Sequence, residues 1–227
     1  MIGCLYLIST PIGNLKDITL RSIEILKNVD LIAVEDTRRS GKLLKEYDVD
    51  TKMISYFEHN EDVRIKEIIE KLKSGFDIAL ISDAGTPTIS DPGYRLVNEV
   101  HKNNIKISSL PGPSSVINAL SVSGLPTDHF YFEGFLPKKK GRLTRFKFLS
   151  SLPATVILFE SPFRLIKTLL DIEKFMGQRI VSVCREMTKI HEEIFRGSLW
   201  KTINHFKNKK SIKGEIVILI AKAQYED

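Results

Sequence analysis

Cysteine, tryptophan and long apolar runs are scarce in this chain. Its 227 residues include two cysteines and one tryptophan. Because the cysteines form no CxxC or CxH pair, the sequence is neither a disulfide scaffold nor a zinc-binding module, and we expect Cys4 and Cys184 to be small core residues. No apolar stretch approaches the roughly 20 residues that cross a bilayer, and the N-terminus lacks the features of a signal peptide. We therefore expect a reduced, cytoplasmic protein without a metal ion.

The composition is that of a globular protein with an excess of positive charge. Hydrophobic residues make up 42% and charged residues 27%, which excludes a disordered chain. Lysine and arginine number 34 against 28 acidic residues, a formal net charge of +6. Basic residues concentrate in the segments 138–147 and 207–213. Clustered positive charge is typical of proteins that bind nucleic acid, although a solvated surface has the same pattern.

Short apolar runs alternate with amphipathic stretches over the first half of the chain. The pattern predicts strands at 5–9, 30–35, 52–56, 76–82 and 105–109, and helices at 18–27, 39–47, 62–73, 94–103 and 113–122. Strands and helices that alternate in this way form parallel sheets through right-handed crossovers. We therefore predict an N-terminal α/β domain with a parallel sheet over residues 1–124.

The rhythm changes after Gly124. Strands are predicted at 129–132, 154–159, 179–185, 193–195 and 215–220, and helices at 142–149, 162–175 and 200–206. Because some of these strands follow one another without a helix, we expect antiparallel pairs among them. The fold class is therefore α/β with two domains, and the second domain, over residues 128–227, has a mixed sheet.

Three loops that follow predicted strands of the first domain are rich in glycine, proline and hydroxyl groups. They span residues 9–17, 82–93 and 110–115. In open α/β sheets ligands bind at the carboxyl ends of the strands, so these loops are candidate binding segments. None of them matches a dinucleotide-binding GxGxxG motif or a P-loop. Each also has a structural explanation, namely a tight turn, a helix capped by Asp91, and a simple helix start.

Charged residues also follow predicted strands. Glu35 and Asp36 stand close to Arg38. Because adjacent residues of a strand point in opposite directions, we expect one carboxylate to face a cleft and the other an arginine. In the second domain the segments 159–164 and 185–193 carry further charges, which could equally be surface ion pairs of little energetic weight.

Eight segments of the sequence together resemble a known family. The matching strings are LYLISTPIGNLKDITLRSIEIL, VEDTRRSGKLL, SYFEHNE, ISDAGTPTISDPGYRLV, LPGPSSVINALSVSGLP, FYFEGFLPKKKGR, ILFESPFR and CREMTKIHEE. In this order they resemble the tetrapyrrole methylase superfamily and, within it, the branch that methylates a cytidine 2′-hydroxyl of small-subunit ribosomal RNA. The resemblance extends from Leu5 to the KGEIVILI segment and so covers almost the whole chain.

The resemblance implies two α/β domains with S-adenosylmethionine bound between them, and a homodimer. Carried over by motif position, the residues that contact the cofactor are Pro11, Ile12, Gly13, Asp83, Gly85, Thr86, Ser115, Val116 and Phe159. The loop at 82–84 reads serine-aspartate-alanine where the superfamily has glycine-aspartate-proline, and it keeps the aspartate. Relatives often continue into a further small helical domain, whereas this sequence ends soon after its last predicted strand. If that extension contributes to RNA binding, the RNA affinity and partner requirements of this chain do not follow from the resemblance.

The reaction that the resemblance implies is methyl transfer to a ribose 2′-hydroxyl of 16S RNA, either free or in an assembled 30S subunit. Such a hydroxyl is a poor nucleophile until a base accepts its proton. The candidate base is Asp36 or Glu186, and Arg38 or Lys189 would lower the pKa of the hydroxyl or hold an adjacent phosphate. The RNA backbone would contact Lys138, Lys139, Lys140 and Arg142.

Two other functions fit parts of the pattern. The chain could methylate carbon on a tetrapyrrole, as distant members of the superfamily do, although the EDTR and FESPFR strings match the RNA branch. It could also bind RNA without catalysis. The presence of Asp83 and of the proline–glycine turns argues against this second alternative, because a pure RNA-binding protein needs no cofactor cleft.

Overall fold

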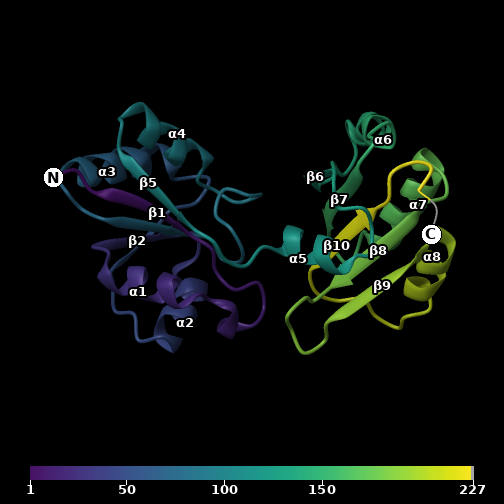
Figure 1. Ribbon diagram of the computed structural model, residues 1–227, viewed down its shortest axis with the longest axis horizontal. Coiled ribbons are helices and arrows are strands. Elements are labelled where there is room, and N and C mark those ends of the chain that lie inside the picture. Colours follow the sequence, from purple (N-terminus) through teal and green to yellow (C-terminus); the bar gives the residue numbers. More distant parts are fainter. Residues whose placement is uncertain (226–227) are drawn as a thin grey trace. The chain divides into compact units, whose positions relative to one another are not determined.

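The computed structural model describes residues 1–225 and divides into two compact units (Figure 1). The first unit is Met1–Ser114, and the second begins at Ser115. Each unit is built around its own five-stranded sheet. The division lies earlier in the chain than the predicted boundary at 124–128. The reason is that helix α5 (Ser115–Val122), which we expected in the first domain, contacts the last strand, β10 (Ile216–Ile220), of the second unit.

The first unit alternates strands and helices as the sequence pattern predicts. Its strands are β1 (Cys4–Ile8), β2 (Leu31–Val34), β3 (Met53–Ser55), β4 (Ile78–Ile81) and β5 (Lys106–Leu110). Its helices are α1 (Leu20–Asn28), α2 (Thr37–Glu46), α3 (Glu61–Lys73) and α4 (Tyr94–Lys102), with a 3₁₀ turn at Leu15–Asp17. The strands form one parallel sheet in the order β3-β2-β4-β1-β5, so the loops that follow them all lie at one edge.

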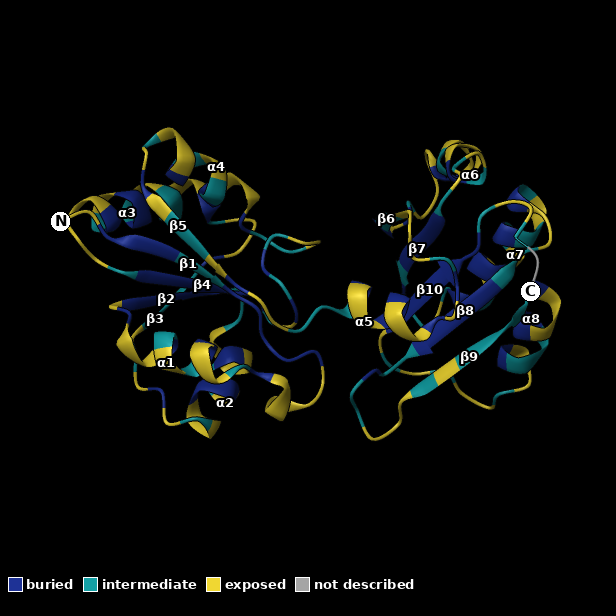
Figure 2. Ribbon diagram, in the orientation of Figure 1, coloured by how far each residue is buried: buried dark blue, intermediate teal, exposed yellow. Residues whose placement is uncertain are grey.

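Helices cover both faces of this parallel sheet. Strands β2 and β4 are buried at every position, as is typical of central strands in a covered sheet (Figure 2). On one face α3 and α4 pack through Leu72 and Leu96, and on the other α1 and α2 pack through Leu26 and Leu43. Complete burial of a leucine side chain stabilises a fold by about 1.5–3 kcal/mol, so these contacts hold the loop-bearing edge in place.

The second unit has a mixed sheet, which confirms the sequence prediction. Its strands are β6 (Phe130–Phe135), β7 (Thr155–Glu160), β8 (Ile180–Arg185), β9 (Glu193–Ser198) and β10, in the order β6-β7-β10-β8-β9. The pair β6–β7 is parallel and the other pairs are antiparallel. Helices α6 (Arg142–Ser150), α7 (Leu165–Met176) and α8 (Leu199–Lys207) pack on the sheet through Phe146, Leu169 and Phe206.

Both cysteines lie in the core, as predicted. Cys4 and Cys184 are buried free thiols, and burial raises the pKa of Cys184 to about 11. Within residues 1–225 no helix combines the length and apolarity needed to cross a membrane. The same residues contain no group of three or more histidine, cysteine, aspartate or glutamate side chains arranged to hold a metal ion.

Candidate functional site

The loops that follow β1 and β4 are joined by hydrogen bonds. Thr10 and Gly85 form a backbone bridge in which each N–H donates to the other's carbonyl at 2.9 Å. The Thr10 hydroxyl donates to the carbonyl of Ser82 at 2.9 Å, and the Ser82 hydroxyl donates to the carbonyl of Gly85 at 3.2 Å. Gly85 has φ +83°, which glycine adopts without strain, and this allows the second loop to turn back onto the first. Two segments far apart in the sequence therefore form one connected surface.

The loop after β5 is part of the same surface. The hydroxyls of Ser9 and Thr86 lie 3.0 Å apart, and the Thr86 hydroxyl donates to the carbonyl of Pro113 at 3.2 Å. Gly112 approaches the first loop so closely that a Cβ at this position would lie 2.9 Å from Cβ of Ser9. The three loops that the sequence indicates as binding segments are thus in direct contact at the carboxyl edge of the sheet.

The predicted cofactor residues of the first unit divide by exposure. Gly13 is exposed, and Asp83 and Thr86 are partly exposed. Pro11, Ile12 and Gly85 are buried, and Ile12 packs close to Gly85. The first group can therefore contact a ligand through its side chains or backbone, whereas the second group shapes the loops behind it.

Strand β2 is followed by two carboxylates in different environments. Asp36 is the N-cap of α2, where its Oδ1 accepts from the N–H of Arg38 at 2.8 Å and its Oδ2 from the guanidinium of Arg38 at 2.9 Å. These hydrogen bonds from Arg38 lower the pKa of Asp36 to about 2. Glu35 has no such pairing with Arg38, and burial together with the nearby Asp83 raises its pKa. Asp36 is therefore held by Arg38, while Glu35 is the stronger proton acceptor.

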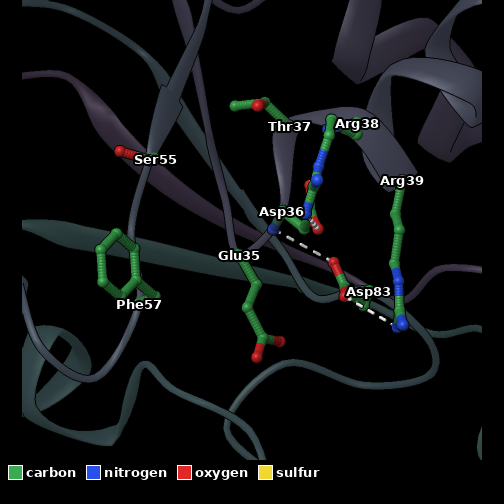
Figure 3. A pocket seen from close by; sticks show the side chains of 8 residues that line it. All are labelled: Glu35, Asp36, Thr37, Arg38, Arg39, Ser55, Phe57 and Asp83. Atoms are coloured by element: carbon green, nitrogen blue, oxygen red, sulfur yellow. Dashed lines mark hydrogen bonds and ion pairs between the residues drawn. The ribbon is translucent and has the colours of Figure 1, made fainter.

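Glu35 lines a pocket at the carboxyl edge of the sheet (Figure 3). The pocket has a volume of about 590 Å³ and is lined by Glu35, Asp36, Thr37, Arg38, Arg39, Ser55, Phe57 and Asp83. Asp83 is fixed there, because its carboxylate accepts from the N–H of Asp36 at 3.2 Å and from Nη1 of Arg39 at 3.1 Å. Figure 3 shows the Phe57 ring on one side of this space and the two arginines on the other. The pocket can therefore hold a polar organic molecule that has a flat apolar part.

Asp91 does not cap α4, contrary to the structural explanation of its loop. Gly93 occupies the N-cap at φ +129°, where a Cβ would lie 2.8 Å from Cδ2 of Leu80. The carboxyl of Asp91 is half-buried and hydrogen-bonded to Ser82. Burial, with Glu35 nearby, raises its pKa to about 6. The segment 82–93 thus places a second carboxyl of high pKa at the same edge of the sheet.

Glu186 and Lys189 bind each other in the second unit. Nζ of Lys189 lies 2.9 Å from Oε1 of Glu186 and 2.9 Å from Oε2 of Glu215. The N–H of Glu215 also donates to Oε1 of Glu186 at 2.9 Å. Although burial acts to raise the pKa of Glu186, hydrogen bonds from Glu215 and Lys189 lower it overall. These contacts close the segment between β8 and β9, so the geometry does not favour Glu186 as a base.

The remaining predicted cofactor residues lie in the second unit. Ser115 and Val116 begin α5, and Phe159 lies on β7. The ring of Phe159 packs edge-on against Phe132 and Phe135, with centroid distances of 4.9 and 5.5 Å. A role for Ser115, Val116 and Phe159 in cofactor binding stays a prediction.

The basic segment 138–147 contains exposed lysines and a buried arginine. The three lysines at 138–140 lie in an exposed turn before α6. Arg142, by contrast, is 8% exposed, and its Nε and Nη2 donate at 2.8 Å to Asp171 and Thr168 respectively. Because its guanidinium is engaged inside the unit, Arg142 has a structural role, and its contact with RNA stays a prediction.

The charged segment 159–164 belongs to the same buried network. Glu160 is 3% exposed and accepts from Nε of Arg164 at 2.6 Å and from the Thr168 hydroxyl at 2.5 Å. Removing one partner from a buried ion pair typically costs about 3–5 kcal/mol, because a charge is left unpaired. This segment therefore stabilises the second unit and is not a surface ion pair.

The pocket contains two groups that are not among the predicted catalytic or cofactor-binding residues. Glu35, and not Asp36, is the carboxylate of raised pKa. An available signal was that an aspartate immediately before a helix is a typical N-cap, which accounts for Asp36. Phe57 follows β3 in the string SYFEHNE, and its spacing carries no signal, because the pocket unites side chains from separate segments.

The chain matches the family of tetrapyrrole (corrin/porphyrin) methylases over residues 4–201. A Thermotoga maritima protein named ribosomal RNA small subunit methyltransferase I is 47% identical over 219 residues, which cover 96% of this chain and 98% of that protein. A Synechocystis protein of the same name is 48% identical over 227 residues, which cover 99% of this chain and 81% of that protein.

Solved structures share the fold at low sequence identity. Diphthine synthase superposes with a TM-score of 0.77 at 15% identity, covering 98% of this chain and 92% of that one. Cobalt precorrin-4 methyltransferase, a cobalamin biosynthetic enzyme, superposes with a TM-score of 0.70 at 16% identity, covering 96% and 94%. At these identities the likeness shows the architecture alone.

Proposed function

Because the chain belongs to the tetrapyrrole methylase family, we propose that it is an S-adenosylmethionine-dependent methyltransferase that modifies a cytidine 2′-hydroxyl of small-subunit ribosomal RNA. The observation that carries this proposal is the similarity over nearly the whole chain. Relatives named ribosomal RNA small subunit methyltransferase I are 47% and 48% identical to it over 219 and 227 aligned residues. The three connected loops of the first unit support the proposal, since they offer a polar surface at the ligand-binding edge of the sheet.

The residues of this surface fit S-adenosylmethionine chemically. The cofactor carries cationic sulfonium and ammonium groups, a carboxylate and ribose hydroxyls. The carboxylate of Asp83 complements the cationic groups, while the hydroxyl of Thr86 and the turn amides complement the carboxylate and the ribose. When bound, the cofactor supplies an electrophilic methyl group, so the chain has to orient the acceptor oxygen and accept its proton.

Glu35 takes the place of Asp36 as the base in this proposal. With a pKa of about 2 and an ion pair to Arg38, Asp36 is a weak proton acceptor. Glu35 lines the pocket, and its raised pKa makes it a stronger proton acceptor than Asp36. Glu35→Gln should therefore lower kcat by about 10²–10⁴-fold, the usual contribution of general base catalysis. Asp36→Asn keeps a helix-capping side chain and is the matched control, which should retain most of the wild-type kcat.

Asp83 is proposed to hold the cofactor, and the same strand offers a control. Asp83 follows β4 at its carboxyl end, whereas Asp77 precedes β4 at its amino end and accepts from the N–H of Cys4 at 2.7 Å. Asp83→Asn should weaken S-adenosylmethionine binding by about 10- to 150-fold, as expected for loss of a hydrogen bond to a charged group. Asp77→Asn should leave the affinity unchanged. Equal affinities of the two variants, measured by calorimetry, would contradict this assignment.

The exposed lysines at 138–140 are proposed to contact the RNA backbone. Replacing all three with glutamate should weaken RNA binding and reduce its dependence on salt, because fewer counterions are released, while the cofactor affinity stays the same. If RNA affinity and salt dependence are unchanged, this segment has no role in RNA binding. The homodimer that the resemblance implies and the cytoplasmic location expected from the composition both stay predictions.

The deciding experiment is a methyl-transfer assay with labelled S-adenosylmethionine and small ribosomal subunits that lack the modification. Label in an alkali-resistant dinucleotide of the RNA, mapped to a cytidine, would establish 2′-O-methylation. Naked small-subunit RNA, tested in parallel, tells whether assembly is required. Transfer to a tetrapyrrole and none to RNA would replace the proposal with its first alternative. RNA binding without transfer to either acceptor would favour a non-catalytic relative.

A further inference from the structure

We infer that the pocket lined by Glu35 and Phe57 receives one nucleotide of the RNA substrate, with its base stacked on the Phe57 ring. This inference rests on the proposed function and assigns the place where the acceptor nucleotide binds. The volume of about 590 Å³ lies within the range of roughly 300–1,000 Å³ that is typical of small-molecule sites. Proteins recognise single-stranded RNA mainly through bases that leave the stack and pack on aromatic rings.

The Phe57 ring is presented by a closed turn. The N–H of Phe57 donates to Oδ1 of Asn60 at 2.9 Å, and the N–H of Asn60 donates back to the carbonyl of Phe57 at 2.9 Å. Nδ2 of Asn60 also donates to the carbonyl of Ser55 at 3.1 Å, which ties the turn to β3. Phe57 nevertheless remains 38% exposed at the border of the pocket (Figure 3). A ring that is fixed by its backbone and left partly uncovered is suited to stacking.

Two arginines at the rim of the pocket keep unused donors. Arg38 engages Asp36 through Nε and Nη2, and Arg39 engages Asp83 through Nη1. An arginine side chain has five N–H donors, so both guanidinium groups can bind a further anion. Their side chains are 89% and 72% exposed. The carboxylates therefore orient the guanidinium groups, whose remaining donors can reach a phosphate outside the pocket.

The charge balance places the base and ribose, and not a phosphate, inside the pocket. Three carboxylates, Glu35, Asp36 and Asp83, line it together with two arginines. A phosphate deep in the pocket would therefore meet a net negative charge, whereas a neutral base and ribose would not. In this arrangement the ribose lies near Glu35, which accepts the proton of its 2′-hydroxyl, and the adjacent phosphate lies at the rim.

Substitutions of Phe57 test the inference by RNA binding alone, without methyl transfer. The probe is a fluorescein-labelled oligocytidylate, and its anisotropy reports the affinity. Phe57→Ala should weaken binding by about 5- to 140-fold, the loss expected for one stacked base. Phe57→Leu should behave like the alanine variant because it has no ring, whereas Phe57→Tyr should bind like the wild type. The matched control is Phe76→Ala, since Phe76 is 41% exposed and precedes β4 at the opposite edge of the sheet.

Calorimetry with S-adenosylmethionine tests whether this pocket is separate from the cofactor site. All four variants should bind the cofactor with wild-type affinity. A Phe57→Ala variant that loses cofactor affinity and keeps RNA affinity would overturn the inference, because the pocket would then belong to the cofactor. Unchanged RNA affinity of Phe57→Ala, or no binding of the oligonucleotide by the wild type, would also overturn it. If the wild type methylates ribosomal RNA while Phe57→Ala binds RNA normally, only the assignment of the pocket fails. If Phe57→Ala loses RNA affinity but the wild type transfers no methyl group, only the proposed reaction fails.

Discussion

Gly112 holds the loop after β5 against the loop after β1, so its replacement by alanine should force two parts of the site apart. The added Cβ would lie 2.9 Å from Cβ of Ser9, whereas carbon atoms pack at about 3.5–4.0 Å. Ser9 is 2% exposed and has little room to move away. Overpacking of this kind costs about 1–3 kcal/mol. We expect Gly112→Ala to lower the free energy of unfolding of the first unit by this amount.

The displacement should also weaken cofactor binding. The Ser9 hydroxyl is hydrogen-bonded to Thr86, whose hydroxyl donates to the carbonyl of Pro113. A shift of the loop after β1 or of the loop after β5 therefore disturbs the loop after β4, which carries Thr86.

A second substitution, Ser9→Gly, removes the Cβ that the alanine at position 112 would meet. By itself Ser9→Gly costs the hydrogen bond to Thr86, about 0.5–1.5 kcal/mol. The double variant should therefore be less destabilised than the sum of the single variants, by about 1–3 kcal/mol.

Urea denaturation followed by circular dichroism measures the four free energies of this cycle. The matched control is Gly41→Ala in α2, where the added Cβ lies 3.8 Å from Cε of Met53, an ordinary contact. Alanine inside a helix should stabilise that variant by about 0.5–1 kcal/mol. Additive effects of Gly112→Ala and Ser9→Gly, or wild-type stability of Gly112→Ala, would refute the close approach of the two loops.

Three further outcomes are expected from burial. Burial raises the pKa of Asp91 to about 6, whereas the pKa of an aspartate in the unfolded chain is about 4. Between these two pH values the folded state binds more protons than the unfolded state. The Asp91 carboxyl therefore destabilises the fold increasingly as the pH rises from about 4 to about 6. The stability of Asp91→Asn relative to the wild type, from urea denaturation, should therefore increase from about pH 4 to about pH 6 and then level off. Arg142→Ala should destabilise the second unit by about 3–5 kcal/mol in urea denaturation, since it leaves Asp171 unpaired, whereas Lys139→Ala should have little effect. The Cys184 thiol, whose pKa burial raises to about 11, should react with a thiol reagent slowly in the native protein and rapidly in urea.

Each of these expectations has a contrary result. A stability difference for Asp91→Asn that does not vary with pH would mean that its carboxyl is not held at a raised pKa. Loss of RNA affinity in Arg142→Ala, at unchanged stability, would contradict its structural role and assign this arginine to the RNA-binding surface. Fast labelling of Cys184 under native conditions would contradict its burial in β8.

The sequence by itself determined the elements, the two sheets and the family. Apolar runs such as 78–81 are read as buried strands, and stripes such as that of α3 as amphipathic helices, because both patterns are local properties of the chain. Alternation of the two predicted the parallel sheet, and adjacent strands after Gly124 predicted the mixed one. The candidate loops were also evident, since they combine glycine, proline and hydroxyl residues directly after strands.

Only the tertiary structure decided which side chains of these segments are available for chemistry. Glu35 and Asp36 are adjacent in sequence, yet burial, together with the nearby Asp83, raises the pKa of Glu35, whereas hydrogen bonds from Arg38 lower the pKa of Asp36. Arg142 stands in a basic run but is buried against Asp171 of α7. The pocket beside Phe57 exists because β2, β3 and β4 end at the same edge of one sheet. Burial, ion pairing and pocket shape depend on contacts between distant segments, and such contacts leave no periodic signal in the sequence.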